Sequence, residues 1–202
     1  MTSSTPHLAL AMLTALALAA CAGPPLKFYT LNGGSVMGSA GRLPPGAPVI
    51  ELDRLTLPDY VDSQDILIRQ GSVLGRSDGG RWISRLSLLA TSLLTAQLAT
   101  RAPGALVTDQ WQGTAPDYRI MVHVTRLDIT SAGVASLDAY WQIVPRDHEL
   151  PTVRNRTQIR ITGPVATDQD VVDLDSELFD RLAGAIQLPY PARPKSTPNA
   201  PN

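Results

Sequence analysis

An alternation of apolar and polar side chains in the middle third of this 202-residue chain restricts its fold more than any other feature. The alternating segments are residues 118–125, 137–144 and 153–161. Residues two apart lie on the same face of a β-strand, so the alternation predicts three strands, each with one buried and one solvated face. The connections, Ser131-Ala132-Gly133 and residues 145–151, have hairpin length, so we expect an antiparallel sheet.

The third of these segments carries three arginines on a single face, namely Arg154, Arg156 and Arg160. A solvated outer face is the common explanation for such a row in an antiparallel sheet. The alternative is a patch that binds anions. Both interpretations place the arginines on the side of the sheet that faces away from the core.

The longer of two helical patterns in the sequence includes residues 86–100, which carry no charge. Its apolar members fall at spacings of four and three residues, which places them along one side of a helix: Trp82, Leu86, Leu89, Leu93 and Ala96. A turn signal, Ser77-Asp78-Gly79-Gly80, precedes it. Because a helix without charges is mostly covered, we expect it to pack on its own sheet. The alternative is contact with a second copy of the chain through hydroxyl-bearing residues, which are Ser84, Ser87, Thr91 and Thr95.

A second helix is predicted after Thr167, because Thr167 and Asp170 have the spacing of a capping box. The apolar residues that follow at helical spacing are Val171, Leu174, Leu178, Leu182 and Ala185. Acidic residues around the start of this helix complement its dipole, and they lack the spacing of a calcium-binding loop.

The remaining segments complete an α+β single domain, with a mainly antiparallel sheet and two principal helices packed on it. Residues 26–31 predict a short strand, and residues 33–48 a loop rich in glycine, serine and proline. Further strands are predicted within residues 49–57 and 65–69, the second as an edge strand or hairpin arm. The domain therefore comprises residues 21–48, with the first strand and the loop, and residues 49–188. Residues 189–202 hold five prolines and are predicted to be a disordered tail.

The N-terminus predicts export and attachment to a lipid. Residues 8–20 are apolar and uncharged, but they are fewer than the ~20 residues that span a bilayer. They end in Leu18-Ala19-Ala20-Cys21, the pattern of a bacterial lipoprotein signal, which is cut before the cysteine after a diacylglycerol joins its sulfur. We therefore predict a signal peptide at residues 1–20 and lipidation of Cys21. The alternative is an ordinary secretory signal, since residues 2–7 contain no lysine or arginine. Ala22, rather than aspartate, favours the outer membrane by resemblance to enterobacterial lipoproteins.

Composition and motifs give no support for catalysis. Seventeen basic residues against 18 acidic ones leave no excess of positive charge for nucleic acid. A single cysteine excludes an internal disulfide, and the scattered histidines His7, His123 and His148 predict no zinc site. Signature sequences for a nucleophile elbow, a phosphate loop or a dinucleotide site do not occur. We predict no catalytic residue, metal or cofactor.

Several segments, taken in order, resemble the PqiC/YmbA family of lipoproteins, which are auxiliary components of paraquat-inducible, MCE-type transport systems. The matching pieces are Lys27-Phe28-Tyr29-Thr30-Leu31, Val49-Ile50-Glu51-Leu52, Leu57-Pro58-Asp59-Tyr60-Val61-Asp62, Asp65-Ile66-Leu67-Ile68-Arg69, Arg81-Trp82-Ile83-Ser84-Arg85-Leu86 and Ser136-Leu137-Asp138-Ala139-Tyr140-Trp141.

The resemblance implies a non-enzymatic periplasmic domain tethered to the inner leaflet of the outer membrane of a Gram-negative bacterium. Its implied partner is a PqiB-like MCE-domain protein anchored in the inner membrane, which the lipoprotein docks to the outer membrane, thereby supporting envelope integrity. The residues we predict for partner contacts are Leu57, Pro58, Tyr60, Asp62, Arg69, Arg81 and Trp82, although the helical phase of Trp82 favours the core. Self-association through the uncharged helix is a further prediction.

Two other functions stay open at this point. One is a generic outer-membrane assembly or stability lipoprotein with another protein partner. The other is a lipid-anchored periplasmic hydrolase, which requires a cleft that brings His123 or His148 beside a serine or an aspartate.

Overall fold

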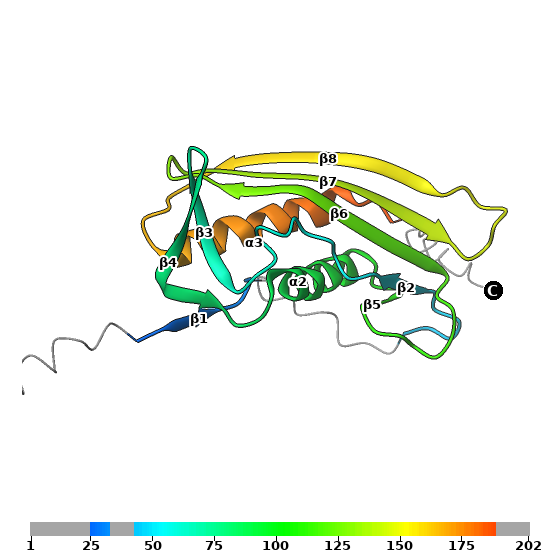
Figure 1. Ribbon diagram of the computed structural model, residues 1–202. Helices are drawn as coiled ribbons and strands as arrows, with labels where there is room; N and C mark the ends of the chain where they lie inside the picture. Colours follow the sequence, from blue (N-terminus) through cyan, green and yellow to red (C-terminus); the bar gives the residue numbers. More distant parts are fainter. Residues whose placement is uncertain (1–24, 33–42, 189–202) are drawn as a thin grey trace, which may run out of the picture.

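Three long antiparallel strands form the centre of the fold, as the alternation predicts. A computed structural model describes residues 25–32 and 43–188, and in it β6 (Tyr118–Ile129), β7 (Val134–Pro145) and β8 (Val153–Thr162) lie side by side (Figure 1). Alternate residues of β6 and β7 are buried, whereas β8 is exposed or half-buried throughout. The predicted signal peptide, Cys21 and the tail at 189–202 lie outside the described residues, as does the 33–42 part of the predicted loop.

The turn between β6 and β7 forms at the predicted tripeptide. A hydrogen bond from Thr130 N to Val134 O, 2.9 Å long, closes this turn. Gly133 has φ +77°, a conformation that L side chains rarely adopt, and its missing Cβ leaves room for the carbonyl of Gly163. Glycine is therefore required at this turn on both counts.

Two short strands extend the sheet on the other edge of β6. β2 (Val49–Leu52) pairs in parallel with both β6 and β5 (Leu106–Thr108), which gives the order β5-β2-β6-β7-β8. The predicted strand at residues 49–57 thus ends earlier, at Leu52, and β5 was not predicted. A three-residue strand is too short to show an alternation.

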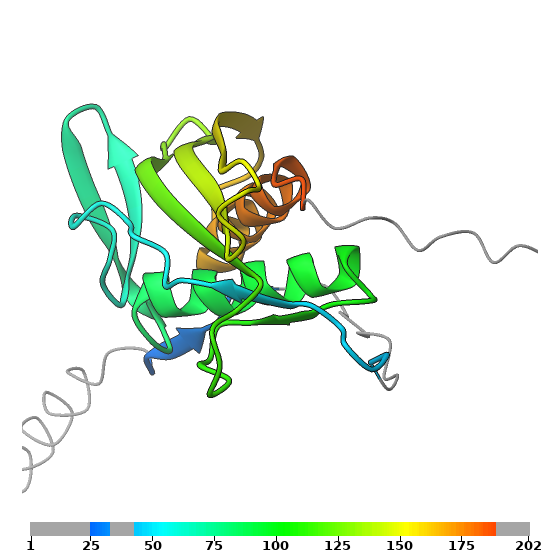
Figure 2. The same cartoon turned by 90° about the vertical axis from the view of Figure 1, so that its right-hand side faces the viewer.

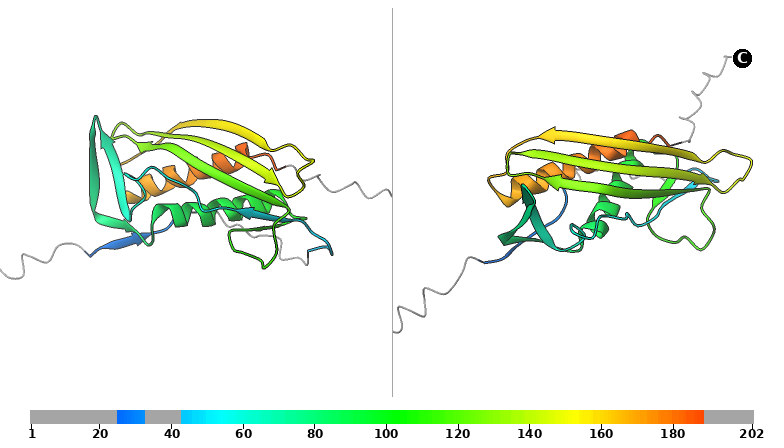
Figure 3. Two further views of the ribbon diagram at one scale, coloured as in Figure 1. Left: turned by 45° about the vertical axis from the view of Figure 1, so that its right-hand side comes forward. Right: turned by 45° about the horizontal axis from the view of Figure 1, so that its top comes forward.

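A second sheet, in the order β1-β4-β3, stands at one end of the long strands (Figure 3). It contains β1 (Lys27–Tyr29), β3 (Asp65–Gln70) and β4 (Val73–Trp82). β3 is an edge strand and an arm of the β3–β4 hairpin, as predicted. The turn predicted at residues 77–80 is wrong, because these residues lie within β4. A Cβ on Gly80 would collide with Asp168 and crowd the ring of Tyr29, so this glycine serves a close approach of neighbours instead of a turn.

The first described helix, α2 (Leu86–Arg101), begins later than its apolar spacing suggested, since Trp82 ends strand β4. Its buried face is also rotated from the predicted stripe, because Leu89 and Ala96 are only half-buried. The fully buried positions are Leu86, Ser87, Ala90, Thr91, Leu93, Leu94 and Leu98.

Two of the hydroxyl-bearing residues of α2 are buried within the chain itself. Thr91 Oγ1 accepts a hydrogen bond from Leu55 N over 3.0 Å and donates one to Ser87 O over 2.7 Å. Ser87 Oγ accepts from Arg54 over 3.0 Å. The prediction that the helix packs within its own domain is therefore confirmed for this face, and a second copy of the chain cannot reach Ser87 or Thr91.

The second described helix, α3 (Asp168–Ala185), confirms the predicted capping box. Asp170 N donates to Thr167 Oγ1, and Thr167 N donates to Asp170 Oδ2. Both helices lie on the same side of the long strands (Figures 1 and 2), where α3 buries Leu178, Phe179 and Leu182 completely. The α+β single-domain prediction is confirmed, with the addition that the short strands β1, β2 and β5 pair in parallel.

Candidate functional site

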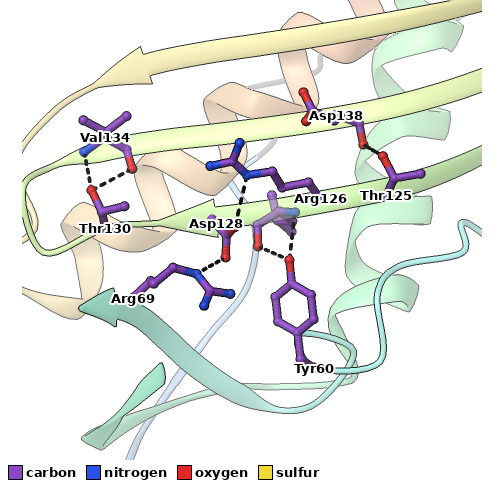
Figure 4. A network of polar contacts seen from close by, with 9 residues as sticks. Tyr60, Arg69, Thr125, Arg126, Asp128, Thr130, Val134 and Asp138 are labelled. Atoms are coloured by element: carbon purple, nitrogen blue, oxygen red, sulfur yellow. Dashed lines mark hydrogen bonds and ion pairs between the residues drawn. The ribbon is translucent and has the colours of Figure 1, made fainter. Parts of the chain in front are cut away.

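The edge of β6 that faces away from β7 is covered over most of its length by one run of chain. After β2, Asp53 N donates to Ile120 O and Thr56 N donates to Val122 O, while Val124 N donates to Thr56 O. Farther along, the Tyr60 hydroxyl donates to Leu127 O over 3.3 Å and accepts from Leu127 N over 3.4 Å (Figure 4). We call residues 53–62 the strap, because they supply partners for backbone groups that a sheet edge otherwise leaves unpaired.

β3 continues this coverage beyond the strap. Ser131 N donates to Arg69 O over 2.9 Å, and Arg69 Nε forms an ion pair with Asp128 Oδ1 at 2.7 Å (Figure 4). Arg126 pairs with the other oxygen of Asp128 at 3.2 Å. The hydrogen bond to Asp128 raises the pKa of the Arg69 guanidinium, which also lies 5.5 Å from the centre of the Tyr60 ring. Arg69 therefore holds the β3–β4 hairpin against the main sheet.

Asp62 fixes the start of α2. Its Oδ1 accepts from Ser87 N over 3.1 Å, and its Oδ2 pairs with Arg85 at 2.7 Å. Partial burial by itself raises the pKa of Asp62, but the hydrogen bonds from Ser87 and the charge of Arg85 outweigh burial and lower the pKa below its ordinary value. The carboxylate thus stabilises the N-terminus of a helix that has no acidic residue in its first turn.

The other residues predicted for partner contacts also have internal roles. Leu57 and Trp82 are 5% and 1% exposed and belong to the core, as the helical phase of Trp82 favoured, so neither side chain is open to a partner in this structure. Pro58 is half-buried, and its carbonyl accepts from the amides of Val61 and Asp62. The Arg81 guanidinium donates to the carbonyls of Ser77 and Gly80. Of the seven predicted residues, only Tyr60 is classed as exposed.

A small cavity of about 20 Å³ lies beneath the strap and the second sheet, which is room for about one water molecule. Val61, Trp82, Asp128 and Asp175 are among the residues that line it. Burial raises the pKa of the Asp175 carboxyl to about 7, and no hydrogen bond or ion pair joins this carboxyl to another described residue. This buried acid is therefore protonated over most of the acidic pH range.

The outer face of the main sheet is different in character, because its polar groups point to solvent. Cross-strand pairing places His123, Tyr140 and Arg156 in one row, and Met121, Gln142 and Arg154 in the next. An open concavity of about 520 Å³ lies over these rows. The lining residues are Asp53, Arg54, Thr56, Met121, Val122, His123, Tyr140, Trp141, Gln142, Arg154 and Asn155. It is much larger than the cavity beneath the strap.

Aromatic and basic groups dominate this concavity. The rings of His123 and Tyr140 stack with their centres 4.7 Å apart, and the Tyr140 side chain is 54% exposed. No described acidic side chain lies within ion-pairing distance of Arg54, Arg154 or Arg156, whereas Asp53 is already paired with Arg119 at 3.6 Å. The site has the composition of a surface that binds an acidic or aromatic partner group.

Among the described residues, no hydrogen bond joins the His123 ring to Asp53 or to a hydroxyl, and His148 lies exposed in the β7–β8 turn. The described part of the chain contains no group of acidic, histidine or cysteine side chains that could hold a metal ion. No described helix is long and apolar enough to cross a membrane.

Sequence reasoning identified part of this surface and missed the rest. The row Arg154, Arg156 and Arg160 was singled out as either solvated or anion-binding, and all three residues are exposed on the predicted face. Arg54 and Met121 were not proposed for a site, and Tyr140 was noted only within the family resemblance. The alternation places Met121 and Tyr140 on outward-facing positions, but only the pairing register brings them beside His123.

A family model described as "ABC-type transport auxiliary lipoprotein component" matches residues 29–187 of the chain. This match spans both sheets and both described helices. None of the curated proteins matches the sequence at a significant level.

The fold also occurs in solved structures. An uncharacterized protein superimposes with a TM-score of 0.64 at 14% identity, over 80% of this chain and 96% of that chain. A Xanthomonas campestris protein superimposes with a TM-score of 0.55 at 13% identity, over 78% of this chain and 93% of that chain. A chain of the PelC dodecamer from Paraburkholderia phytofirmans gives 0.41 at 12% identity, over 71% and 90%. The first two likenesses show a shared fold.

Proposed function

This chain belongs to the family of ABC-type transport auxiliary lipoproteins, and from that premise we propose that it docks an MCE-domain protein to the outer membrane. In this proposal the MCE protein is PqiB-like, anchored in the inner membrane, and forms a tube for lipids across the periplasm. The lipoprotein itself carries out no reaction and supports envelope integrity by positioning the tube. The family match over residues 29–187 is the observation that carries the proposal.

The lipid anchor of the proposal is Cys21, which follows the Leu18-Ala19-Ala20 sequence expected of a lipoprotein signal. Several acyl chains on one residue hold a protein at a bilayer far more firmly than the single chain that gives marginal attachment. Replacing Cys21 with alanine is expected to abolish incorporation of a fatty-acid analogue and to keep the leader uncleaved. Incorporation at the wild-type level in Cys21→Ala would refute lipidation at this residue.

We assign the partner contacts to the outer face of the main sheet, with its concavity, rather than to the strap. Arg154 and Arg156 are exposed there without acidic partners among the described residues, and Tyr140 offers an aromatic surface. Aromatic and arginine side chains carry most of the binding energy in many protein interfaces. From the predicted set, Tyr60 and Arg69 stay in the proposal as secondary contacts, because each retains exposed surface.

Co-purification tests the proposal directly. The lipoprotein, co-expressed with a PqiB-like MCE protein of the same bacterium and extracted in mild detergent, is expected to retain that protein on an affinity column. The variant Tyr140→Ala/Arg156→Ala is expected to lose most of the retained partner. The control Trp111→Ala/Arg181→Ala also removes one aromatic residue and one arginine, at exposed positions away from the concavity, and is expected to retain the partner.

Two outcomes would count against the proposal. Failure of the wild-type protein to retain any MCE partner, with the lipoprotein intact and lipidated, would shift the assignment to a generic outer-membrane assembly lipoprotein. Equal loss of partner in both double variants would remove the concavity as the contact surface. Self-association through the exposed side of α2, near Leu88, stays a separate prediction that sedimentation of the same samples checks.

A further inference from the structure

Large apolar side chains are exposed together at the end of the second sheet where the chain enters the described domain. Phe28 in β1 is 58% exposed and Ile83, directly after β4, is 55% exposed. Leu26, two residues before Phe28, is 47% exposed. We call these three residues the entry patch. Exposed aliphatic and aromatic residues that lie together mark a contact surface more often than isolated ones do.

The strand register shows that Phe28 and Ile83 share a face. β1 pairs in parallel with β4 so that Phe28 lies opposite Arg81 and Tyr29 opposite Trp82, and Ile83 N donates to Tyr29 O over 2.8 Å. Trp82 is buried, so the positions on either side of it point away from the core. The patch is therefore on the outer side of this sheet, opposite the side that packs on α3.

The sequence fixes how far this patch is from the lipid. Leu26 is five positions after Cys21, and an extended chain spans at most about 3.6 Å per residue, so Cys21 lies within roughly 18 Å of Leu26. No such limit applies to the other exposed apolar residues. Trp111 and Leu150 lie in the β5–β6 and β7–β8 connections, at the opposite end of the long strands from β1 (Figure 1).

We propose that the entry patch inserts into the lipid headgroup region of the membrane that holds the Cys21 acyl chains. This inference rests on the lipid anchor of the proposed function and adds to it a second, non-covalent membrane contact that sets the orientation of the domain. Apolar side chains on a face held close to a bilayer partition into its interface.

Contact between the entry patch and the bilayer would set the orientation of the whole domain relative to the membrane. With the β1–β4 end at the bilayer, the long strands point away from the membrane, and the β5–β6 and β7–β8 connections face the periplasm. The outer face of the main sheet then stands to the side of the attachment point, where a partner that crosses the periplasm can reach it.

An environment-sensitive fluorophore tests this contact, because the chain has one cysteine, whose sulfur carries lipid under the proposed function. A cysteine introduced as Phe28→Cys or Ile83→Cys is then the sole free thiol, and it is labelled with a nitrobenzoxadiazole probe. The lipidated protein is placed in vesicles of phosphatidylethanolamine and phosphatidylglycerol. Matched controls carry the same probe at Trp111→Cys and Leu150→Cys.

We expect probes at residues 28 and 83 to emit at shorter wavelength in vesicles and to be quenched several-fold less by aqueous iodide than the two control probes. With the probe at Leu26→Cys, the further change Phe28→Ser/Ile83→Ser is expected to restore quenching. Unchanged thermal unfolding of each variant shows that the fold is intact.

Equal quenching at residues 28 and 111 would overturn the inference. Shielding at residue 28 that appears only after a partner protein is added, and not with vesicles alone, would also overturn it. If the probe also labels the wild-type protein, to which no cysteine has been added, then the sulfur of Cys21 is free. That result removes the lipid anchor and so contradicts the proposed function itself, whereas an accessible probe on a lipidated protein contradicts the entry patch alone.

Discussion

The strap side and the outer face of the main sheet use the same residue types for different purposes. On the strap side, the Tyr60 hydroxyl bonds to the backbone of Leu127, and Arg69 pairs with Asp128. On the outer face, the Tyr140 side chain is 54% exposed, and Arg156 has no acidic partner among the described residues. Residue type alone therefore does not separate a structural role from a binding role in this protein.

The backbone explains the difference. The β6 edge past β2 has no regular neighbouring strand, so its amide and carbonyl groups need partners from the strap and from β3. The backbone groups of β7 are already satisfied by β6 and β8 on its two sides, so side chains above it, such as Tyr140, have no such task. Polar residues beside an incomplete sheet edge are used in hydrogen bonds to its backbone. Polar residues above a fully paired strand remain exposed and can contact a partner.

The largest expected effect comes from replacing Trp82 with alanine, because this side chain is 1% exposed in the core beneath the strap. We expect a loss of about 3–5 kcal/mol in the free energy of unfolding. Tyr140→Ala, on the outer face, should change it by no more than about 0.5 kcal/mol. Urea denaturation of both variants measures the contrast, and comparable losses would show that the outer face also belongs to the core.

The second prediction concerns pH and the buried Asp175 below the strap. Burial raises its folded-state pKa to about 7 from the ordinary 3.8, so between these values the folded protein holds a proton that the unfolded chain releases. The free energy of unfolding should therefore decrease as pH rises from about 4 to about 7, by an amount on the order of a few kcal/mol.

Asp175→Asn is expected to remove this decrease and to make the protein more stable than the wild type at pH 8. Asp138→Asn, on the outer face, provides the matched control for the loss of one aspartate. Thermal unfolding across this pH range measures all three proteins. A wild-type profile that rises between pH 4 and 7, and is not altered by Asp175→Asn, would be incompatible with a buried unpaired acid.

A smaller effect is expected from removing a single hydroxyl group. Tyr60→Phe leaves Leu127 N and O without their side-chain partner and should cost about 1–2 kcal/mol of unfolding free energy. Tyr140→Phe removes a hydroxyl from the exposed face and should cost nothing measurable. If the two variants are equally stable in urea, then the strap does not depend on this contact.

The smallest effect on stability is expected for Arg154→Ala/Arg156→Ala, which should stay within about 0.5 kcal/mol of the wild type because neither guanidinium has an acidic partner in the described fold. The same variant should retain less of the co-expressed MCE protein. Arg85→Ala gives the opposite pattern, since it removes the Asp62 ion pair and leaves the outer face intact. If Arg154→Ala/Arg156→Ala lowers the free energy of unfolding but retains the MCE protein, then these outer-face arginines have a structural role and not a binding role.

Local patterns predicted much of the fold because they depend on neighbours in the chain. The alternation from Tyr118 onward predicted the three long strands, and the Thr167–Asp170 pair predicted the start of α3. The arginine row on β8 was placed correctly on an outward face. The glycine pair before Trp82 misled the interpretation, because a glycine that allows close approach looks the same in sequence as one that makes a turn.

The amino-acid sequence by itself predicted the three long strands, the capping box of α3 and the kinship with transport lipoproteins, since each depends on residues a few positions apart or on a pattern of matched segments. Only the tertiary structure decided which polar residues are free. Tyr60 and Leu127 are 67 positions apart, and their contact exists because the strap follows the open edge of β6. A backbone group that needs a partner takes the nearest side chain in space, and sequence distance does not reveal which one that is.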